Sequence, residues 1–177
     1  MDEMFDAAGA ALCCAAAIRL GGAMRVLAAR AELSDGYDLV SAGVDNIVAS
    51  LEGQDLDEDA LGKAFGENWI LDARYPAGLS GRAFFSKWTQ LVFVTIVLTR
   101  PRQQQLVAVQ GLDSALEAAA AWPSDVRVGS FTRLADYELA CQQETEERLR
   151  KGGLPVLRKL AEEQSGQYRR AAELFVG

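Results

Sequence analysis

The stretch that decides the fold is AGAALCCAAAIRLGGAMRVLA, residues 8–28, which lies within a longer apolar segment at residues 3–32. This segment is rich in alanine, the strongest helix former, and contains no proline. Its apolar side chains recur at the helical spacing of three and four residues, at Phe5, Ala8, Leu12, Ala16, Leu20, Met24 and Leu27. The sequence therefore predicts one long helix, in which Gly21 and Gly22 either introduce a kink or allow a neighbouring helix to approach closely.

Six further segments with a helical pattern follow this one. They cover residues 36–52, 55–65, about 80–98, 101–121, 131–150 and 155–175. Glycine follows two of them directly, at Gly53 and Gly66, and follows the segment at 131–150 after one residue, at 152–153, as is typical of helix carboxyl termini. The sequence therefore predicts an all-α fold of about six to seven helices, either a helical bundle or stacked helical hairpins. We expect residues 1–177 to form a single domain, with a subdivision near 123–130 as the alternative.

The apolar positions in these segments also predict which helix faces are buried. In the segment at 36–52, the expected inward side chains are Leu39, Val40, Val44, Ile47, Val48 and Leu51. In the segment at 101–121, they are Leu106, Val109, Leu112 and Leu116. Asp55 and Glu58 have the spacing of a capping box, which predicts that Asp55 is the N-cap residue of the third helix.

Residues 91–98, LVFVTIVL, fit two structures. Their β-branched side chains favour a buried strand. However, the helical pattern begins earlier, at Phe84 and Trp88, and the chain has no second run of similar composition with which a strand could pair. We therefore expect a buried helix here, with a strand as the alternative.

The composition is that of an acidic globular protein. Of the 177 residues, 50% are hydrophobic and 24% are charged, and the formal net charge is −7. Nucleic acids and anionic membrane surfaces are polyanions, so both are disfavoured as partners. No uninterrupted apolar run approaches the roughly 18 residues of a membrane span, and the acidic start of the chain is unlike a signal peptide. Three cysteines, two of them adjacent, do not suit a disulfide framework, so we expect a cytoplasmic protein.

Candidates for catalysis or metal binding are sparse. The chain has no histidine, the side chain that most often transfers protons near neutral pH and binds transition metals. Asp55, Asp57 and Asp59 match the first ligands of a calcium loop, but Ala60 and Gly66 stand where the loop needs Gly and Glu. The glutamate pairs at 146–147 and 162–163 diverge around their helices, so we expect solvation or ion pairing between helices there. The sequence thus predicts no catalytic residue, no cofactor and no metal.

One stretch is more negative than the chain as a whole. Residues 32–72 contain eleven acidic side chains and one basic side chain, a formal charge of −10. Three of the acidic residues are seven positions apart on the predicted helix at 36–52 and therefore share one of its faces. This pattern favours a docking surface for a basic protein, with an ordinary solvated face as the alternative. The candidate protein-binding residues are Asp38, Asp45, Glu52, Asp55, Asp57, Glu58 and Asp59.

The carboxyl-terminal part has the opposite balance. Residues 127–170 contain nine basic and seven acidic side chains. The acidic and basic parts could therefore pair within the fold, or between copies of the chain arranged head to tail.

Together these features favour a non-catalytic, acidic, helical protein-binding module. Its most concrete form is a toxin-neutralising, immunity-like inhibitor that covers a basic active site. The first alternative is a helical adaptor or assembly subunit that uses exposed aromatic side chains around Trp69, Tyr75 and Phe84. The second alternative is an enzyme that uses carboxylates without histidine.

Overall fold

The computed structural model describes residues 2–66, 78–98, 105–123 and 126–176, and seven helices lie in these ranges. They are α1 (Asp2–Arg30), α2 (Ser34–Leu51), α3 (Glu58–Gly66), α4 (Gly78–Leu98), α5 (Gln105–Ala120), α6 (Leu134–Gly152) and α7 (Leu154–Val176). The predicted all-α fold is confirmed. Residues 91–98 form the last turns of α4, so the helical interpretation of this segment is also confirmed.

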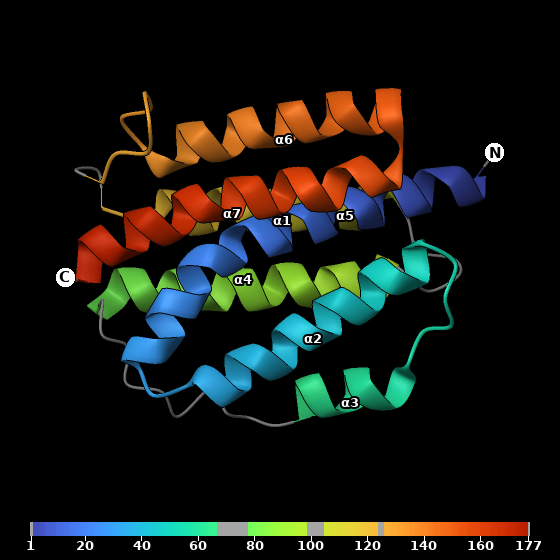
Figure 1. Ribbon diagram of the computed structural model, residues 1–177, viewed down its shortest axis with the longest axis horizontal. Helices are drawn as coiled ribbons and strands as arrows, with labels where there is room; N and C mark the ends of the chain where they lie inside the picture. The colour runs from blue at the N-terminus through green and yellow to red at the C-terminus, as the bar shows by residue number, and fades with distance from the viewer. Residues whose placement is uncertain (1, 67–77, 99–104, 124–125, 177) are drawn as a thin grey trace.

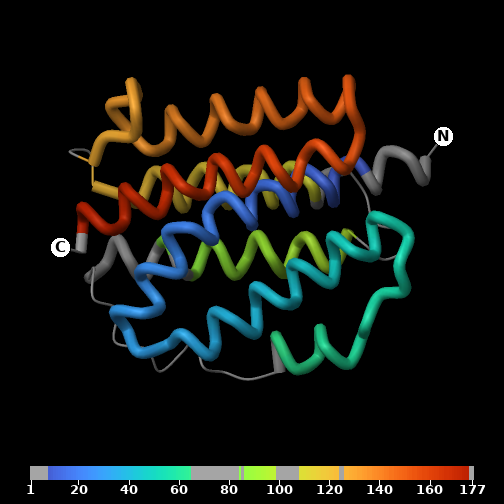
Figure 2. Tube along the Cα trace, in the orientation of Figure 1, coloured from blue at the N-terminus to red at the C-terminus, as the bar shows by residue number. Residues whose placement is uncertain are grey.

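Helix α1 is the centre of the molecule, and three antiparallel helical hairpins surround it (Figure 1). Helix α2 pairs with α3, α4 with α5, and α6 with α7. Helix α1 packs against α2, α4, α5, α6 and α7. Figure 2 shows its trace passing between the α2–α3 hairpin on one side and the α6–α7 hairpin on the other. The fold is therefore a helical bundle assembled from hairpins.

The central position of α1 follows from its composition. A helix that is apolar on every face must be enclosed on every face. Nearly all side chains between Ala10 and Ala28 are buried, including Leu20 and Met24. The segment Ala8–Arg30 is long and apolar enough to cross a membrane by length and composition, and 78% of its apolar window is buried inside the fold. The hairpins thus supply the apolar surroundings that this segment requires.

The glycine pair of α1 serves close packing. Helix α1 continues through Gly21 and Gly22 without a break. A Cβ atom on Gly22 would lie only 2.1 Å from the backbone carbonyl oxygen of Ser165 in α7. Gly111 has the same role in α5, because a Cβ atom there would lie 2.7 Å from the Sγ of Cys13. Glycine at these positions lets α5 and α7 approach the central helix closely.

The buried face predicted for α5 is wrong at Val109, whereas Leu112 packs partly buried against the core and Leu116 is half-buried, as predicted. The side chain of Leu106 lies outside the described residues. Val109 is exposed, whereas Ala115, Ala118 and Ala119 are buried. Helix α5 lies close to α1 and α4, where only small side chains fit, and alanines give a weak periodic signal. In α2, Leu39 is exposed against expectation, and the side chains that are buried as predicted are Val40, Val44, Ile47 and Val48.

The predicted N-cap of the third helix is also wrong by two residues. Helix α3 begins at Glu58, and the Asp57 carboxylate accepts a hydrogen bond of 2.9 Å from the N–H of Ala60. Asn46 of α2 fixes this position, because its amide nitrogen donates to the Asp57 carbonyl at 2.8 Å. Its amide oxygen in turn accepts from the Asp57 N–H at 3.1 Å. A tertiary contact therefore decides which aspartate caps the helix.

Helix α6 begins later than the predicted residue 131. Val128 and Phe131 exchange backbone hydrogen bonds of 2.9 and 3.2 Å, which form a tight turn, and the helix starts at Leu134. It ends at Gly152, and Gly153 has a φ of 69°, a left-handed conformation that favours glycine. The glycine stop expected near residue 152 is therefore confirmed.

Candidate functional site

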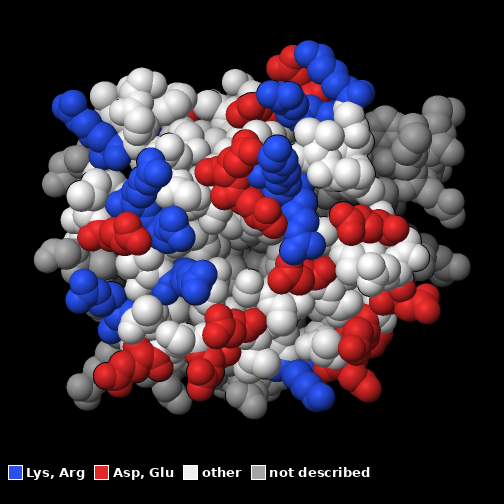
Figure 3. Space-filling view, viewed as in Figure 1, with Lys and Arg blue, Asp and Glu red and all other residues white. Residues whose placement is uncertain are grey.

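All seven predicted protein-binding residues lie on α2, α3 or the connection between them, and all are exposed. We call this set the acidic surface; it consists of Asp38, Asp45, Glu52, Asp55, Asp57, Glu58 and Asp59. Figure 3 shows acidic side chains gathered over α2 and α3, whereas most basic side chains on this face lie over other helices. The structure thus places the predicted residues on one side of the molecule.

Carboxylates on α6 and α7 have a different environment. Most of them pair with a cation one helical turn away, in the pairs Glu144–Arg148, Glu146–Arg150, Glu147–Lys151, Glu162–Arg158, Glu163–Lys159 and Glu173–Arg169. The glutamate pairs at 146–147 and 162–163 therefore form ion pairs within their own helices, where we expected solvation or pairing between helices. The charges of this hairpin largely compensate one another.

An ion pair with α7 compensates Asp45 of the acidic surface. Arg158 of α7 places its Nη2 atom 3.0 Å from the Oδ1 of Asp45. This contact is an instance of the pairing within the fold that the charge asymmetry suggested. Among the described residues, five members of the acidic surface make no ion pair: Asp38, Glu52, Asp55, Asp57 and Asp59. A surplus of negative charge therefore faces solvent on α2 and α3.

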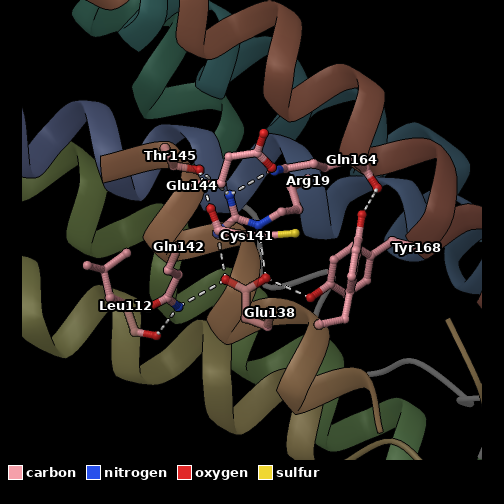
Figure 4. Close-up of polar contacts among 10 residues, drawn as sticks. Arg19, Leu112, Glu138, Cys141, Gln142, Glu144, Thr145, Gln164 and Tyr168 are labelled. Carbon is pink, nitrogen blue, oxygen red and sulfur yellow. Dashed lines mark hydrogen bonds and ion pairs between the residues drawn. The ribbon is translucent and has the colours of Figure 1, made fainter. Parts of the chain in front are cut away.

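A second polar arrangement lies inside the bundle, and the sequence did not predict it (Figure 4). Arg19 of α1 and Glu138 of α6 are completely buried and form a bidentate ion pair, with Nε to Oε2 at 2.9 Å and Nη2 to Oε1 at 2.6 Å. The hydroxyl of Tyr168, on α7, donates to Oε2 at 2.6 Å. Three helices thus meet at one carboxylate.

Neighbouring side chains complete this buried polar cluster. The Nη1 atom of Arg19 donates to Thr145 Oγ1 at 3.3 Å and to Gln164 Oε1 at 3.4 Å. Gln142 donates to Glu138 Oε1 at 3.0 Å, so each carboxylate oxygen accepts two hydrogen bonds. With its carboxylate fully engaged and its ion pair buried, the cluster holds α1, α6 and α7 together.

The ionisation of the cluster fits this structural role. Burial alone would lower the pKa of Arg19, but the Glu138 carboxylate outweighs it and raises that pKa above its usual value. Burial, together with the negative charge of Glu138, raises the pKa of the Tyr168 hydroxyl well above its usual range. Both side chains therefore keep their protons at physiological pH.

The sequence does contain an indication of the buried polar cluster. Arg19 stands alone within the apolar stretch at 8–24, and Glu138 falls on the helix face that also carries Leu134 and Cys141. A charged residue on an apolar face, with an opposite charge on another such face, predicts a buried pair. Arg19 and Glu138 are 119 residues apart in the sequence, so no local pattern shows that they pair.

The three cysteines are buried. Burial raises the pKa of the Cys13 thiol to about 12 and that of Cys141 to about 11. The pKa of Cys14 also rises, first through burial and then through the neighbouring Cys13. A thiol that stays protonated is a poor nucleophile, so these cysteines act as small core residues.

The aromatic surface proposed for an adaptor is not found at Phe84. This residue is fully buried and packs edge-on against Trp122, with ring centroids 4.9 Å apart. Trp69 and Tyr75 lie outside the described residues. The most exposed described aromatic side chain is Phe93, which is 57% exposed on α4.

Comparison of the chain with protein families, with curated proteins and with solved structures finds no match in any of the three. The function is therefore argued from the geometry and charge described above.

Proposed function

We propose that this protein is a non-catalytic binding module whose acidic surface docks onto a basic protein. The observation that carries the proposal is the uncompensated charge of α2 and α3, beside the compensated charge of α6 and α7. Apart from Asp57, which caps α3, these carboxylates repel one another and contribute little to folding. Their concentration on one side is therefore more consistent with recognition than with stability.

A surface of this kind acts mainly on the rate of association. Its electric field attracts a positively charged partner and orients it before contact, and salt screens this effect strongly. The carboxylates also stand on a rigid support, because the Asn46–Asp57 hydrogen bonds fix the α2–α3 connection. A pre-formed surface loses little conformational entropy on binding.

The most concrete form of this proposal is an immunity-like inhibitor. A toxin that acts on nucleic acid or another polyanion needs a basic active site, and an acidic helical surface is complementary to such a site. Inhibition then needs only coverage of the site.

The proposal is tested by charge reversal with a matched control. The test variant changes Asp38, Glu52 and Asp59 to lysine and leaves Asp45 with its internal partner Arg158. The control variant changes Glu146, Glu147 and Glu163 to lysine, so both variants have the same net charge. Immobilised wild type, test variant and control variant are incubated with extract of the source cells at low salt, and the bound proteins are identified.

We expect wild type and control to retain the same basic protein and the test variant to lose it. With that partner purified, association should slow by about tenfold or more in the test variant at low salt, and the difference should shrink in high salt. Binding that persists in high salt and survives the test substitutions would instead support an apolar assembly surface. Failure of all three proteins to retain a basic partner would also contradict the proposal.

A further inference from the structure

A groove lies between the carboxyl-terminal parts of α1 and α7. Its volume is about 390 Å³, within the range of roughly 300–1,000 Å³ that is typical of small-molecule sites. Figure 3 shows basic side chains over these ends of the two helices, which Figure 1 locates. We call it the arginine groove; it is lined by Arg25, Val26, Ala29 and Arg30 of α1 and by Arg169 and Glu173 of α7.

The arginine groove is positive on a protein that is negative overall. Its lining contains three guanidinium groups and one carboxylate, that of Glu173, which gives a formal charge of +2. The whole chain has a formal charge of −7. Because like charges repel, three cations that line one groove are unfavourable unless an anion joins them.

These arginines have few partners within the fold. Arg25 and Arg30 form no ion pair with any residue that the structure describes. The Nε of Arg169 lies 3.9 Å from Oε1 of Glu173, which is beyond hydrogen-bonding distance. By contrast, all three cations of α6 pair with a glutamate one helical turn away. The guanidinium groups of the groove therefore keep their donors available for an external anion.

The helix dipole explains only one of the three arginines. Arg30 lies in the last turn of α1, where a cation interacts favourably with the negative end of the dipole. Arg25 is more than one turn earlier, and Arg169 is about two turns before the end of α7 at Val176. Since the dipole acts only within the last turn, it does not account for their convergence on the groove.

The ligand that fits this charge is a compact anion with more than one negative charge. Guanidinium groups bind phosphate oxygens through paired, charge-assisted hydrogen bonds. A long polyanion such as a nucleic acid would extend past the groove into the negative field of the rest of the molecule. A metal cation would be repelled by the arginines. Val26, which is half-buried, and Ala29 add an apolar surface for the organic part of a ligand.

We propose that the arginine groove binds the phosphate or diphosphate group of a small molecule, which Arg25, Arg30 and Arg169 hold through their guanidinium groups. The organic part of the ligand lies against Val26 and Ala29. This inference goes beyond the proposed docking function and does not rest on it, since the acidic surface of α2 and α3 contributes no residue to the groove.

The test is a titration of the full chain, labelled with ¹⁵N, with sodium pyrophosphate at low salt. Sodium chloride at the same ionic strength is the control for screening, and a poly-glutamate peptide represents an acidic protein segment. We expect pyrophosphate to shift the backbone amides of residues 25–30 and 169–173 saturably, with a dissociation constant on the order of millimolar. Chloride should leave these resonances in place, and poly-glutamate should bind more weakly than pyrophosphate.

Variants of the arginines decide whether these side chains hold the anion. Arg25→Gln and Arg30→Gln should each weaken pyrophosphate binding by about tenfold, as expected when a charge-assisted contact is lost. Arg170→Gln is the matched control, because it removes the same charge from an exposed residue of α7 that does not line the groove. It should bind nearly as wild type does.

A variant of the one carboxylate in the groove should have the opposite effect. Glu173→Gln removes the negative group that competes with the ligand for Arg169, so pyrophosphate should bind about threefold more tightly. Glu163→Gln is its control, since Glu163 is on the same helix, pairs with Lys159 and does not line the groove. A gain in affinity cannot result from damage to the fold.

Four results would overturn the inference: no saturable shift with pyrophosphate, equal weakening by Arg170→Gln, no gain in Glu173→Gln, or tighter binding of poly-glutamate than of pyrophosphate. The last result would assign the groove to an acidic protein segment. Circular dichroism checks the fold of each variant, and all the substituted positions are exposed. Because no basic partner protein is present, failure here would leave the proposed docking function standing, and loss of protein binding would not affect this result.

Discussion

The charged side chains of the buried polar cluster are paired and enclosed, whereas most of those on the acidic surface are unpaired and exposed to solvent. In the cluster, one cation and one carboxylate lie at bonding distance inside the bundle, and every carboxylate oxygen has two donors. On the acidic surface, Asp45 pairs with Arg158, and the exposed carboxylates of Asp38, Glu52, Asp55, Asp57 and Asp59 make no described ion pair. The charged groups that stabilise the fold are paired inside the bundle. The unpaired carboxylates of the acidic surface are therefore the better candidates for a functional role.

The two regions also differ in what a mutation would reveal. A buried ion pair costs much desolvation free energy and is stable only while complete, so breaking it affects folding. An exposed carboxylate is already hydrated, so removing it leaves the folded state almost unchanged. Stability measurements can therefore separate the two roles without knowledge of any ligand.

The largest effect is expected from breaking the buried pair. Glu138→Leu leaves the Arg19 guanidinium buried without its counter-charge, and Arg19→Met leaves the carboxylate in the same position. Each substitution should lower the free energy of unfolding by about 3–5 kcal/mol. The measurement is urea unfolding followed by circular dichroism.

The double variant Arg19→Met with Glu138→Leu is the control. Replacement of a whole buried ion pair by apolar side chains is often neutral, so the double variant should be more stable than either single variant. It also remains measurable if a single variant fails to fold. Losses that simply add would show that the two residues stabilise the fold independently, contrary to the geometry.

The next effect is expected at the contact between α1 and α7 that carries the cluster. Gly22→Ala places a methyl group against the backbone of Ser165, which cannot rotate away as a side chain can. We expect α7 to be displaced and the free energy of unfolding to fall by about 3 kcal/mol. Thermal unfolding with calorimetry measures this loss.

Gly166 in α7 is the matched control for Gly22. A Cβ atom on Gly166 would meet no other atom within 4 Å. Gly166→Ala should therefore raise stability by about 0.5–1 kcal/mol through helix propensity alone. Equal losses at both positions would show that close helix approach is not what Gly22 provides.

The predictability of the two regions from sequence differs for the same physical reason. The acidic surface is local in sequence, so its residues could be listed from the spacing on one predicted helix and the connection after it. The buried cluster joins residues from α1, α6 and α7, and no local pattern brings Arg19 to Glu138. Only the presence of a charged side chain on an apolar face hinted at it.

The helices were predictable where large apolar side chains mark one face, as in α2 and α7. The face of α5 was predictable only in part, because its fully buried residues include alanines beside Gly111. The N-cap of α3 was not predictable, since Asn46 selects Asp57 through hydrogen bonds across eleven residues. Local preference thus identifies the elements, and tertiary contacts determine their faces and ends.

The smallest effect is expected from neutralising the acidic surface. The variant Asp38→Asn, Glu52→Gln, Asp59→Asn should change the free energy of unfolding by less than about 0.5 kcal/mol. Glu52 lies at the carboxyl end of α2, where its removal relieves repulsion, and Asp59 lies in the first turn of α3, where its removal costs a favourable interaction.

The matched variant Glu146→Gln, Glu147→Gln, Glu163→Gln breaks three ion pairs within helices, those with Arg150, Lys151 and Lys159. It should lose about 0.3–0.5 kcal/mol per pair at low salt and less at high salt. Urea unfolding of both variants at two salt concentrations makes the comparison. If neutralising the acidic surface destabilised the protein more than breaking these pairs, the carboxylates of α2 and α3 would serve the fold, and the charge surplus would no longer argue for a partner.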